Sequence, residues 1–370
     1  MQTCFVTGFR GPFGFTPRLS ATSPQTDENT LYSLERIMKR RNFLKAGVGG
    51  FTGAALGASG LLSWSPRSYS ATITHTFYIT DGFIDQPDGV SVYFRGFSSA
   101  SNSLNVPGES LIVQEGDTVT ITIVNTLGTT HSFKIDGVVD SGQIRGGTSK
   151  TITFTPTTAG SYLYYDAQNA PYNRVTGLHG GLAVMPLGKS NQLYSGSPTF
   201  KIQKFWVFNE TDPAWNNAVR NGQTPGSAFK PRYFTLNGLS GRPPGAQGNG
   251  NPDIDAMADH RSALHGRIGD RTLIRALNAG MAIHSVHTHA NHMEWLTRNG
   301  QIRPSIWKKD IIPLEGNMGK VDMIFPFEAP PDAWPPASKG GYPMHLHDEM
   351  TQTAGGGLYM FGAMTDIYFE

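Results

Sequence analysis

An internal repeat constrains the fold of this chain more than any other feature. In the repeat, a Gly-Asp pair is followed by Asn eight residues after the Asp, and then by His six residues after the Asn. Its two copies are Gly116-Asp117, Asn125 and His131, and Gly269-Asp270, Asn278 and His284. A second pair of segments, 162–167 and 342–347, aligns in the same order. Repeated spacing of this kind predicts two copies of one structural unit.

The segments around the repeat have the pattern of β-strands. Residues 118–124, Thr-Val-Thr-Ile-Thr-Ile-Val, alternate polar and apolar side chains, which predicts a strand with one buried face. Residues 73–79, 151–156 and 161–165 are further predicted strands, and no convincing amphipathic helix is recognisable after residue 70. Since 44 Gly and 24 Pro also favour turns, the sequence predicts an all-β fold.

The repeat suggests how the chain is divided. Residues 1–70 are predicted to be a leader, and residues 72–187 the first β domain. Residues 188–198 contain several Gly, Ser and Asn, as linkers do, and residues 199–370 form the second domain. Within the second domain, the proline-bounded segments 243–252 and 330–336 are predicted surface loops.

The leader predicts export. Residues 39–45, Lys-Arg-Arg-Asn-Phe-Leu-Lys, resemble a twin-arginine motif with its pair at Arg40-Arg41. A weakly hydrophobic stretch follows, and the small residues Ser68 and Ser70 fit cleavage before Ala71. The twin-arginine export machinery would deliver the protein to the periplasm or outside the cell; an uncleaved membrane anchor is the alternative. Because Met38 directly precedes the motif, either Met1 or Met38 is the natural start.

Charge and cysteine content exclude several functions. Residues 1–70 hold eight Lys and Arg against three Asp and Glu, so the formal net charge of +2 comes from the leader. The remainder is slightly acidic, which argues against a nucleic-acid partner. The only cysteine, Cys4, also lies in the leader. The rest of the chain therefore has no disulfide and no thiolate, and a bound metal must be held by His, carboxylate, Met or backbone groups.

Six of the eleven histidines fall in two short segments, 284–292 and 345–347. Residues i and i+2 of a strand share one face, so each segment can present a pair of imidazoles side by side. These candidate metal ligands are His287, His289, His345 and His347. Four neutral imidazoles suit Cu, Zn, Fe or Ni, whereas a hydrogen-bonded His core is the alternative.

Other polar residues are candidates for an additional ligand or for the shell around the ligands. They are His284, His292, His131 and Asp348, with Glu349 and Asp322 as further acceptors for the ligating imidazoles. The remaining histidines are interpreted structurally. His179 is assigned to a turn, and His75, His260 and His265 to the surface.

The two histidine segments resemble the third and fourth copper motifs of multicopper oxidases, His-x-x-His-x-His and His-Cys-His. Residues 234–238, Phe-Thr-Leu-Asn-Gly, resemble a strand of the same family, and residues 154–162 resemble the end of its first domain. The resemblance implies two cupredoxin-like Greek-key β-barrel domains, copper as the cofactor, and a small-molecule or metal-ion substrate. The two-domain length is similar to that of small laccases and copper nitrite reductases, which implies a homotrimer as a possible assembly.

The chain departs from the family at decisive positions. Leu346 stands where the family has the Cys of the blue, type 1 copper, and Thr351 stands where it has a further His. In the first domain, Asp136 stands at the position that matches His289, and Asp166 stands at the position that matches Leu346. They could offer oxygen ligands, but solvent-facing loop residues are the favoured interpretation. The resemblance therefore implies a mononuclear or binuclear copper site that is not of the blue type.

Two functions remain open. The first is an exported multicopper-oxidase-like oxidoreductase with a reduced, type 2 or type 3-like copper complement, and the two His pairs favour it. The second is a copper-free or non-catalytic cupredoxin scaffold acting in the cell envelope, which the lost cysteine favours. Copper storage is a weaker third option, since no long Met- or His-rich tract is present. The sequence assigns no catalytic residue and no individual substrate.

Overall fold

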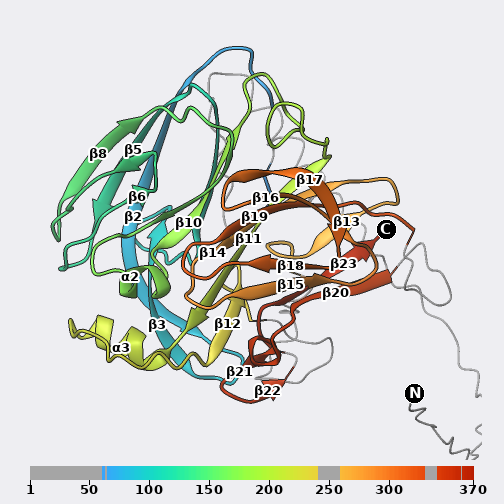
Figure 1. The fold of residues 1–370 in the computed structure, drawn as a ribbon. Coiled ribbons are helices and arrows are strands. Elements are labelled where there is room, and N and C mark those ends of the chain that lie inside the picture. The colour runs from blue at the N-terminus through green and yellow to red at the C-terminus, as the bar shows by residue number, and fades with distance from the viewer. Residues whose placement is uncertain (1–60, 63–64, 241–258, 330–339, 360) are drawn as a thin grey trace, which may run out of the picture. The chain divides into compact units, whose positions relative to one another are not determined.

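The computed structural model describes residues 61–62, 65–240, 259–329, 340–359 and 361–370. The predicted twin-arginine motif and the predicted loops at 243–252 and 330–336 lie outside these residues. The described part is built from four β-sheets with a few short helices, so the predicted all-β class is confirmed (Figure 1). None of the helices in this part has the length and apolar character needed to cross a bilayer.

Residues 72–185 form a sandwich of two sheets. The first sheet has the order β3 (Ser91–Ser98), β2 (Thr72–Asp85), β5 (Thr118–Asn125) and β8 (Ser149–Phe154). The second has the order β4 (Gly108–Gln114), β10 (His179–Met185), β9 (Gly160–Tyr165), β6 (Lys134–Ile135) and β7 (Val139–Asp140). The strands predicted from alternation correspond to β2, β5, β8 and β9. Their apolar faces enclose a core that includes Phe77, Ile121 and Leu182.

Residues 202–369 form a second sandwich. Its larger sheet has the order β17 (Gln301–Lys309), β16 (Met293–Arg298), β19 (Lys320–Phe325), β14 (Thr272–Asn278), β11 (Ile202–Thr211), β12 (Tyr233–Leu236), β21 (Thr353–Ala354) and β22 (Leu358–Tyr359). Its smaller sheet has the order β13 (Leu264–Gly266), β23 (Met364–Phe369), β20 (Gly340–Leu346), β15 (His284–Thr288) and β18 (Ile311–Leu314).

A third apolar core joins the two sandwiches. Ile112, Leu163 and Ala183 from the first sandwich pack with residues of β11 and β14, including Phe205 and Leu273. Each of these five side chains is less than 9% exposed. Between the sandwiches, residues 188–198 contain no helix or strand. The shared core holds the faces of β9 and β19 together, and the polar cleft described below lies beside these strands.

Within the described residues, three short helices interrupt the strands: α2 (Tyr172–Val175), α3 (Pro213–Arg220) and the 3-10 helix η1 (Glu349–Gln352). The absence of an amphipathic helix was a wrong prediction, because α3 buries Trp215 and Val219 on one face. Asp212 caps this helix by accepting a hydrogen bond from the Ala214 amide, and Pro213 suits its first turn. The helix is two turns long, which is too short for a periodic pattern to stand out in the sequence.

The last residues of the predicted leader contact the folded part. Leu61 and Leu62 form β1 (Leu61–Leu62), which pairs with β11. Asp117, which belongs to the Gly-Asp repeat, is fully buried and receives hydrogen bonds from the Arg67 guanidinium at 2.6 Å and from the Ala71 amide at 2.8 Å. Cleavage before Ala71 would therefore remove the arginine that pairs with this buried carboxylate.

Candidate metal centre

The two histidine segments lie on neighbouring antiparallel strands, β15 and β20, with His287 directly opposite His345. His289 follows β15 and His347 follows β20, and their amides continue the ladder by donating to the Pro343 and Ser285 carbonyls. Side chains alternate between the two faces of a strand, so these four imidazoles share one face. Val286 and Leu346 point to the opposite face, into the core of the second sandwich.

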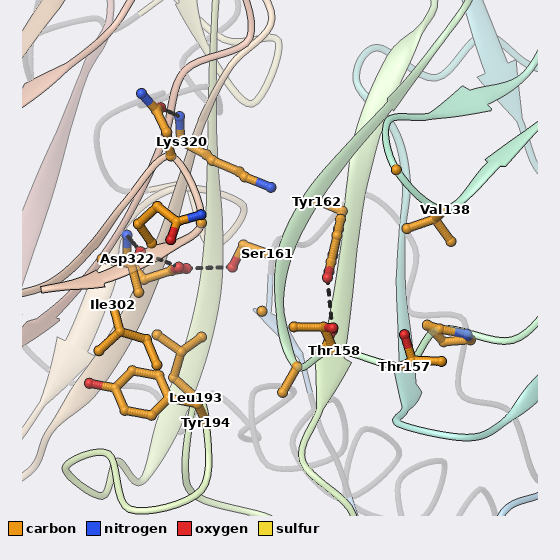
Figure 2. A pocket seen from close by; sticks show the side chains of 18 of the residues that line it. Val138, Thr157, Thr158, Ser161, Tyr162, Leu193, Tyr194, Ile302, Lys320 and Asp322 are labelled. Atoms are coloured by element: carbon orange, nitrogen blue, oxygen red, sulfur yellow. Dashed lines mark hydrogen bonds between the residues drawn. The ribbon is translucent and has the colours of Figure 1, made fainter.

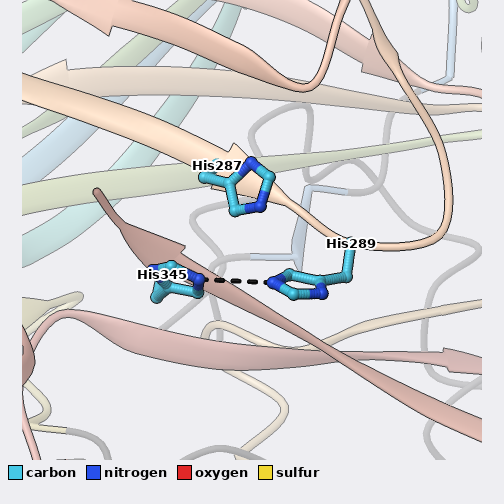
Figure 3. Close-up of side chains that lie close together, drawn as sticks. All are labelled: His287, His289 and His345. Atoms are coloured by element: carbon cyan, nitrogen blue, oxygen red, sulfur yellow. Dashed lines mark hydrogen bonds between the residues drawn. The ribbon is translucent and has the colours of Figure 1, made fainter. Parts of the chain in front are cut away.

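Three of the four imidazoles come together closely. One ring nitrogen from each of His287, His289 and His345 lies within 4.8 Å of the other two (Figure 3). The Nε2 atoms of His289 and His345 are 3.3 Å apart. All three side chains are partly buried. No other group of three or more such metal-binding side chains is found within the described residues.

Backbone carbonyl groups orient two of these rings. Nδ1 of His287 donates to the Asp310 carbonyl oxygen at 3.1 Å, and Nδ1 of His345 donates to the Leu346 carbonyl oxygen at 3.0 Å. A carbonyl can only accept, so each Nδ1 carries a proton and each Nε2 keeps its lone pair for a metal. The sequence suggested carboxylates for this role. Asp322 is instead engaged with Ser161 and Thr297, away from the cluster.

His347 lies next to the three-histidine group without being part of it. Its ring centroid is 5.2 Å from that of His287, and its ring lies nearly parallel to that of His345 at 6.1 Å. The side chain is exposed. The structure therefore brings three of the four predicted ligands together and places the fourth at their edge.

The surroundings favour a neutral imidazole at His287. Burial lowers the pKa of this side chain, while the hydrogen bond to the Asp310 carbonyl opposes that shift. The neighbouring His345 and His347 lower its pKa further, because two adjacent positive rings repel each other. A neutral ring is the form that binds a metal ion.

His284 faces the other way. It is 2% exposed and lies on the core side of β15, with Nε2 2.6 Å from the buried Glu210 carboxylate. The angles at this contact do not satisfy a hydrogen bond, so the two side chains lie close together without an aligned bond. Leu346, at the position of the family's cysteine, packs in the apolar core, and Thr351 is buried nearby in sequence. The predicted role of His284 as an additional ligand is not supported by this geometry.

None of the other three candidates in the second domain, His292, Asp348 and Glu349, joins the cluster. His292 is exposed and lies outside the group of three. The Asp348 carboxylate caps η1 by accepting from the Met350 amide. Glu349 is exposed in the first turn of the same helix.

In the first sandwich, His131 is held in a buried network instead of an open site. Its Nδ1 is 2.6 Å from the Asp166 carboxylate, and its Nε2 is 2.8 Å from the Thr129 hydroxyl, so both ring nitrogens are occupied. The interpretation of Asp166 as a solvent-facing residue is wrong, because Asp166 is fully buried. Asp136 is 55% exposed, as that interpretation predicted.

Two other histidines are more buried than predicted. His179 opens β10 and is 1% exposed instead of lying in a turn. His75 is partly buried, packs edge-on against Phe77 and lies 3.5 Å from Glu109. His260 and His265 are exposed, as predicted.

The burial of His179 predicts a pH-dependent stability. Burial lowers its pKa from 6.5 to about 4, although its hydrogen bond to the Arg174 carbonyl opposes the shift. Between pH 6.5 and 4 the unfolded chain binds a proton that the folded chain rejects, so stability falls as the pH falls through this window. Between pH 7 and pH 4, we expect the unmodified chain to lose about 3 kcal/mol more of its free energy of unfolding than the His179→Gln variant loses. Urea denaturation at both pH values measures these losses. Equal losses in the unmodified chain and in His179→Gln would contradict a lowered pKa of His179.

Comparisons with known proteins agree with this architecture. Residues 100–188 match the family model for multicopper oxidases. A multicopper oxidase named mgLAC superposes with a TM-score of 0.63 and 21% sequence identity, covering 80% of this chain and 86% of its own. No protein among the curated sequences matches the chain.

Two similar structures come from Nitrosomonas europaea. Its blue copper oxidase has a TM-score of 0.62 and 20% identity, covering 80% of this chain and 85% of that one. Its copper nitrite reductase has a TM-score of 0.58 and 18% identity, covering 81% and 94%. The predicted cupredoxin-like fold and the predicted resemblance are therefore confirmed: residues 100–188 match the multicopper oxidase model, and the chain has the fold seen in multicopper oxidases and in a copper nitrite reductase.

Proposed function

We propose that this protein is a copper-dependent oxidoreductase of the multicopper oxidase type that has a reduced copper complement. The observation that carries the proposal is the convergence of ring nitrogens from His287, His289 and His345 within 4.8 Å. The copper would be held by these three imidazoles, with His347 beside them, and no blue copper would be present.

The residues present fit copper. Three neutral imidazole donors are a common ligand set for copper and for zinc, whereas calcium and magnesium prefer oxygen ligands. The carbonyl groups that hold His287 and His345 leave Nε2 of each ring available. Because Nε2 of His345 has no proton, Nε2 of His289 must donate across the 3.3 Å contact when no metal is bound. Metal binding then requires His289 to give up or shift this proton.

The residue at position 346 limits how electrons could reach the three-histidine site. Bound copper would supply one-electron transfer to a small molecule or metal ion at an open position of its coordination sphere. The side chain of Leu346, unlike a thiolate, cannot ligate a second copper, and it lies in the apolar core. A substrate would therefore exchange electrons with the three-histidine site directly. The exposed His347 stands at the edge of this site, where it can bind and orient such a substrate.

A copper-free or non-catalytic scaffold is the second candidate. The buried contacts of His131 with Asp166, and of His284 with Glu210, favour it, because two histidines at repeat positions serve the packing of the fold instead of a site. This candidate leaves the convergence of His287, His289 and His345 without a role.

The proposal includes export. The Arg40-Arg41 motif supports transport by the twin-arginine machinery to the periplasm or outside the cell, and this machinery carries folded proteins. The protein would then receive its metal before or during export. A homotrimer is the assembly that we propose from the resemblance, and analytical ultracentrifugation of the purified protein would test it.

Metal analysis of the exported protein tests the proposal. We expect about one copper per chain, a paramagnetic resonance spectrum of a nitrogen-ligated Cu(II) without thiolate character, and no intense visible absorption band. Oxygen consumption with a phenol or with Cu(I) would then identify an oxidase. Protein that carries no copper and takes up none from added Cu(II) would leave the scaffold as the function. Zinc in place of copper would contradict the redox role.

A further inference from the structure

A cleft of about 450 Å³ lies between the two sandwiches (Figure 2). One wall comes from the first sandwich, at residues 155–162 and 136–138. The other comes from the second sandwich, at the turn between β16 and β17 and at β19. Leu193 and Tyr194 from the connecting segment line it as well. Clefts of this size hold small organic ligands, and they often lie where domains meet.

The ammonium group of Lys320 points toward this cleft (Figure 2). Nζ lies over the ring of Tyr162, 4.6 Å from its centroid. Within the described part of the chain, it makes no hydrogen bond and no ion pair, although an ammonium group has three donors to satisfy. The side chain is only partly exposed, so water cannot solvate it as freely as at an open surface.

The carboxylates beside the cleft already have partners. Asp322 accepts hydrogen bonds from the Ser161 and Thr297 hydroxyls, and it lies opposite the buried Arg275 on the neighbouring strand. Glu115 accepts from two backbone amides, at Ala159 and Leu187. Each of these two carboxylates therefore has hydrogen-bond donors of its own, whereas no hydrogen bond or ion pair holds the Lys320 ammonium group within the described residues.

Asp136, the third carboxylate, is similarly engaged. It accepts a hydrogen bond from the Tyr165 hydroxyl at 2.9 Å and lies 3.5 Å from the ammonium group of Lys134. It is also 55% exposed, so water screens its charge.

Part of the lining is aromatic or apolar, beside polar residues that include Thr157, Thr158 and Gln301. Tyr162 faces the cleft from the first sandwich, and Tyr194 and Ile302 lie together on the opposite side (Figure 2). Val138 and Leu193 add apolar surface. A flat ring could pack between these walls while an attached anion meets the lysine.

From these observations we propose that the cleft binds a small aromatic carboxylate. The carboxylate accepts from the Lys320 ammonium, and the ring packs between Tyr162 and Tyr194. Burial lowers the pKa of Lys320, against the opposing effect of Asp322 and Asp136, and a bound anion would raise it again. The site is distinct from the histidine cluster, because β16 and β19 belong to the larger sheet of the second sandwich and the histidines to the smaller one.

Fluorine NMR with 4-fluorobenzoate tests this proposal on the full chain. We expect a saturable change in the signal with the unmodified protein and none with the neutral isostere 4-fluorobenzamide. Lys320→Met should weaken 4-fluorobenzoate binding at least about 10-fold, because a charged hydrogen bond is lost, and Lys320→Arg should retain part of it. The variant His345→Ala, at the candidate metal centre, should bind 4-fluorobenzoate as the unmodified chain does.

Several outcomes would overturn the proposal. Equal binding of the acid and the amide would remove the role of Lys320, as would full affinity in a folded Lys320→Met variant. If Lys320→Met fails to fold, two other results still test the proposal. A folded Lys320→Arg variant that does not bind 4-fluorobenzoate, or unmodified protein that binds 4-fluorobenzamide equally well, would contradict it. Loss of 4-fluorobenzoate binding in His345→Ala would indicate that the carboxylate binds at the candidate metal centre and not in the cleft. No saturable binding at millimolar ligand would reject an aromatic carboxylate site altogether.

Discussion

The variant His345→Ala is expected to bind Cu(II) at least about 100-fold more weakly than the unmodified chain, since loss of an outer hydrogen-bond partner alone costs about 10- to 100-fold. His345 faces His287 directly across the ladder, and its Nε2 lies 3.3 Å from that of His289. Removing it leaves two donors of the group, His287 and His289, which come from one segment of the chain. Competition against a chelator of known affinity, on metal-free protein, measures the effect.

Matched variants make this test specific. His292→Ala should change the copper affinity by less than about 3-fold, because His292 is exposed and lies outside the group of three. His347→Ala should cost about 10-fold, as expected for a group at the edge of the site. Each variant should unfold at nearly the same urea concentration as the unmodified chain. A His292 effect as large as that of His345 would mean that the metal sits elsewhere.

The histidine cluster could be predicted because it depends on local rules. Alternation along a strand places His287 with His289, and the repeat brings the two segments to matching positions of one unit. The register that sets His287 against His345 was not predicted and is seen only in the structure. Periodicity describes each strand by itself and does not say which strands pair.

The partners of the histidines could not be predicted in this way. The acceptors for His287 and His345 are backbone carbonyl groups, and every residue has one, so sequence gives no sign of which will be used. Likewise, Glu210 meets His284 only because β11 and β15 come together in space. Burial of such polar groups depends on pairs distant in sequence, and side-chain type alone favours the surface for each of them.

The cleft beside Lys320 could not be predicted from the sequence either, because its walls come from two different sandwiches. Tyr162 belongs to the first sandwich and Lys320 to the second, and each position by itself resembles an ordinary surface residue. Only the shared core, where Leu163 packs with Leu273, brings these strands together. Sequence predicted both sandwiches, but it gave no information on the surface where they meet.

Replacing Asp166 by alanine is expected to lower the free energy of unfolding by about 3 to 5 kcal/mol, because it removes a buried carboxylate that accepts from several donors. The carboxylate is fully buried and lies 2.6 Å from Nδ1 of His131. It also accepts from the amide and hydroxyl of Ser132, from the Gln168 amide and from the Asn173 side chain, each at 2.8 Å. The substitution leaves the buried Ser132 amide and hydroxyl without this acceptor, whereas the Asn173 side chain keeps the Gln168 carbonyl. Each buried donor left unpaired costs about 1 to 3 kcal/mol.

Urea denaturation followed by circular dichroism measures this loss, and Asp140→Ala provides the control. Asp140 lies in the same sandwich but is 52% exposed, so its replacement should cost less than about 1 kcal/mol. The two candidate roles of Asp166 then separate. If its carboxylate serves the fold, Asp166→Ala is destabilised but keeps the full copper content when folded. If it ligates a metal, the folded variant loses copper with little change in stability, and the buried network around His131 would have to open in the working protein.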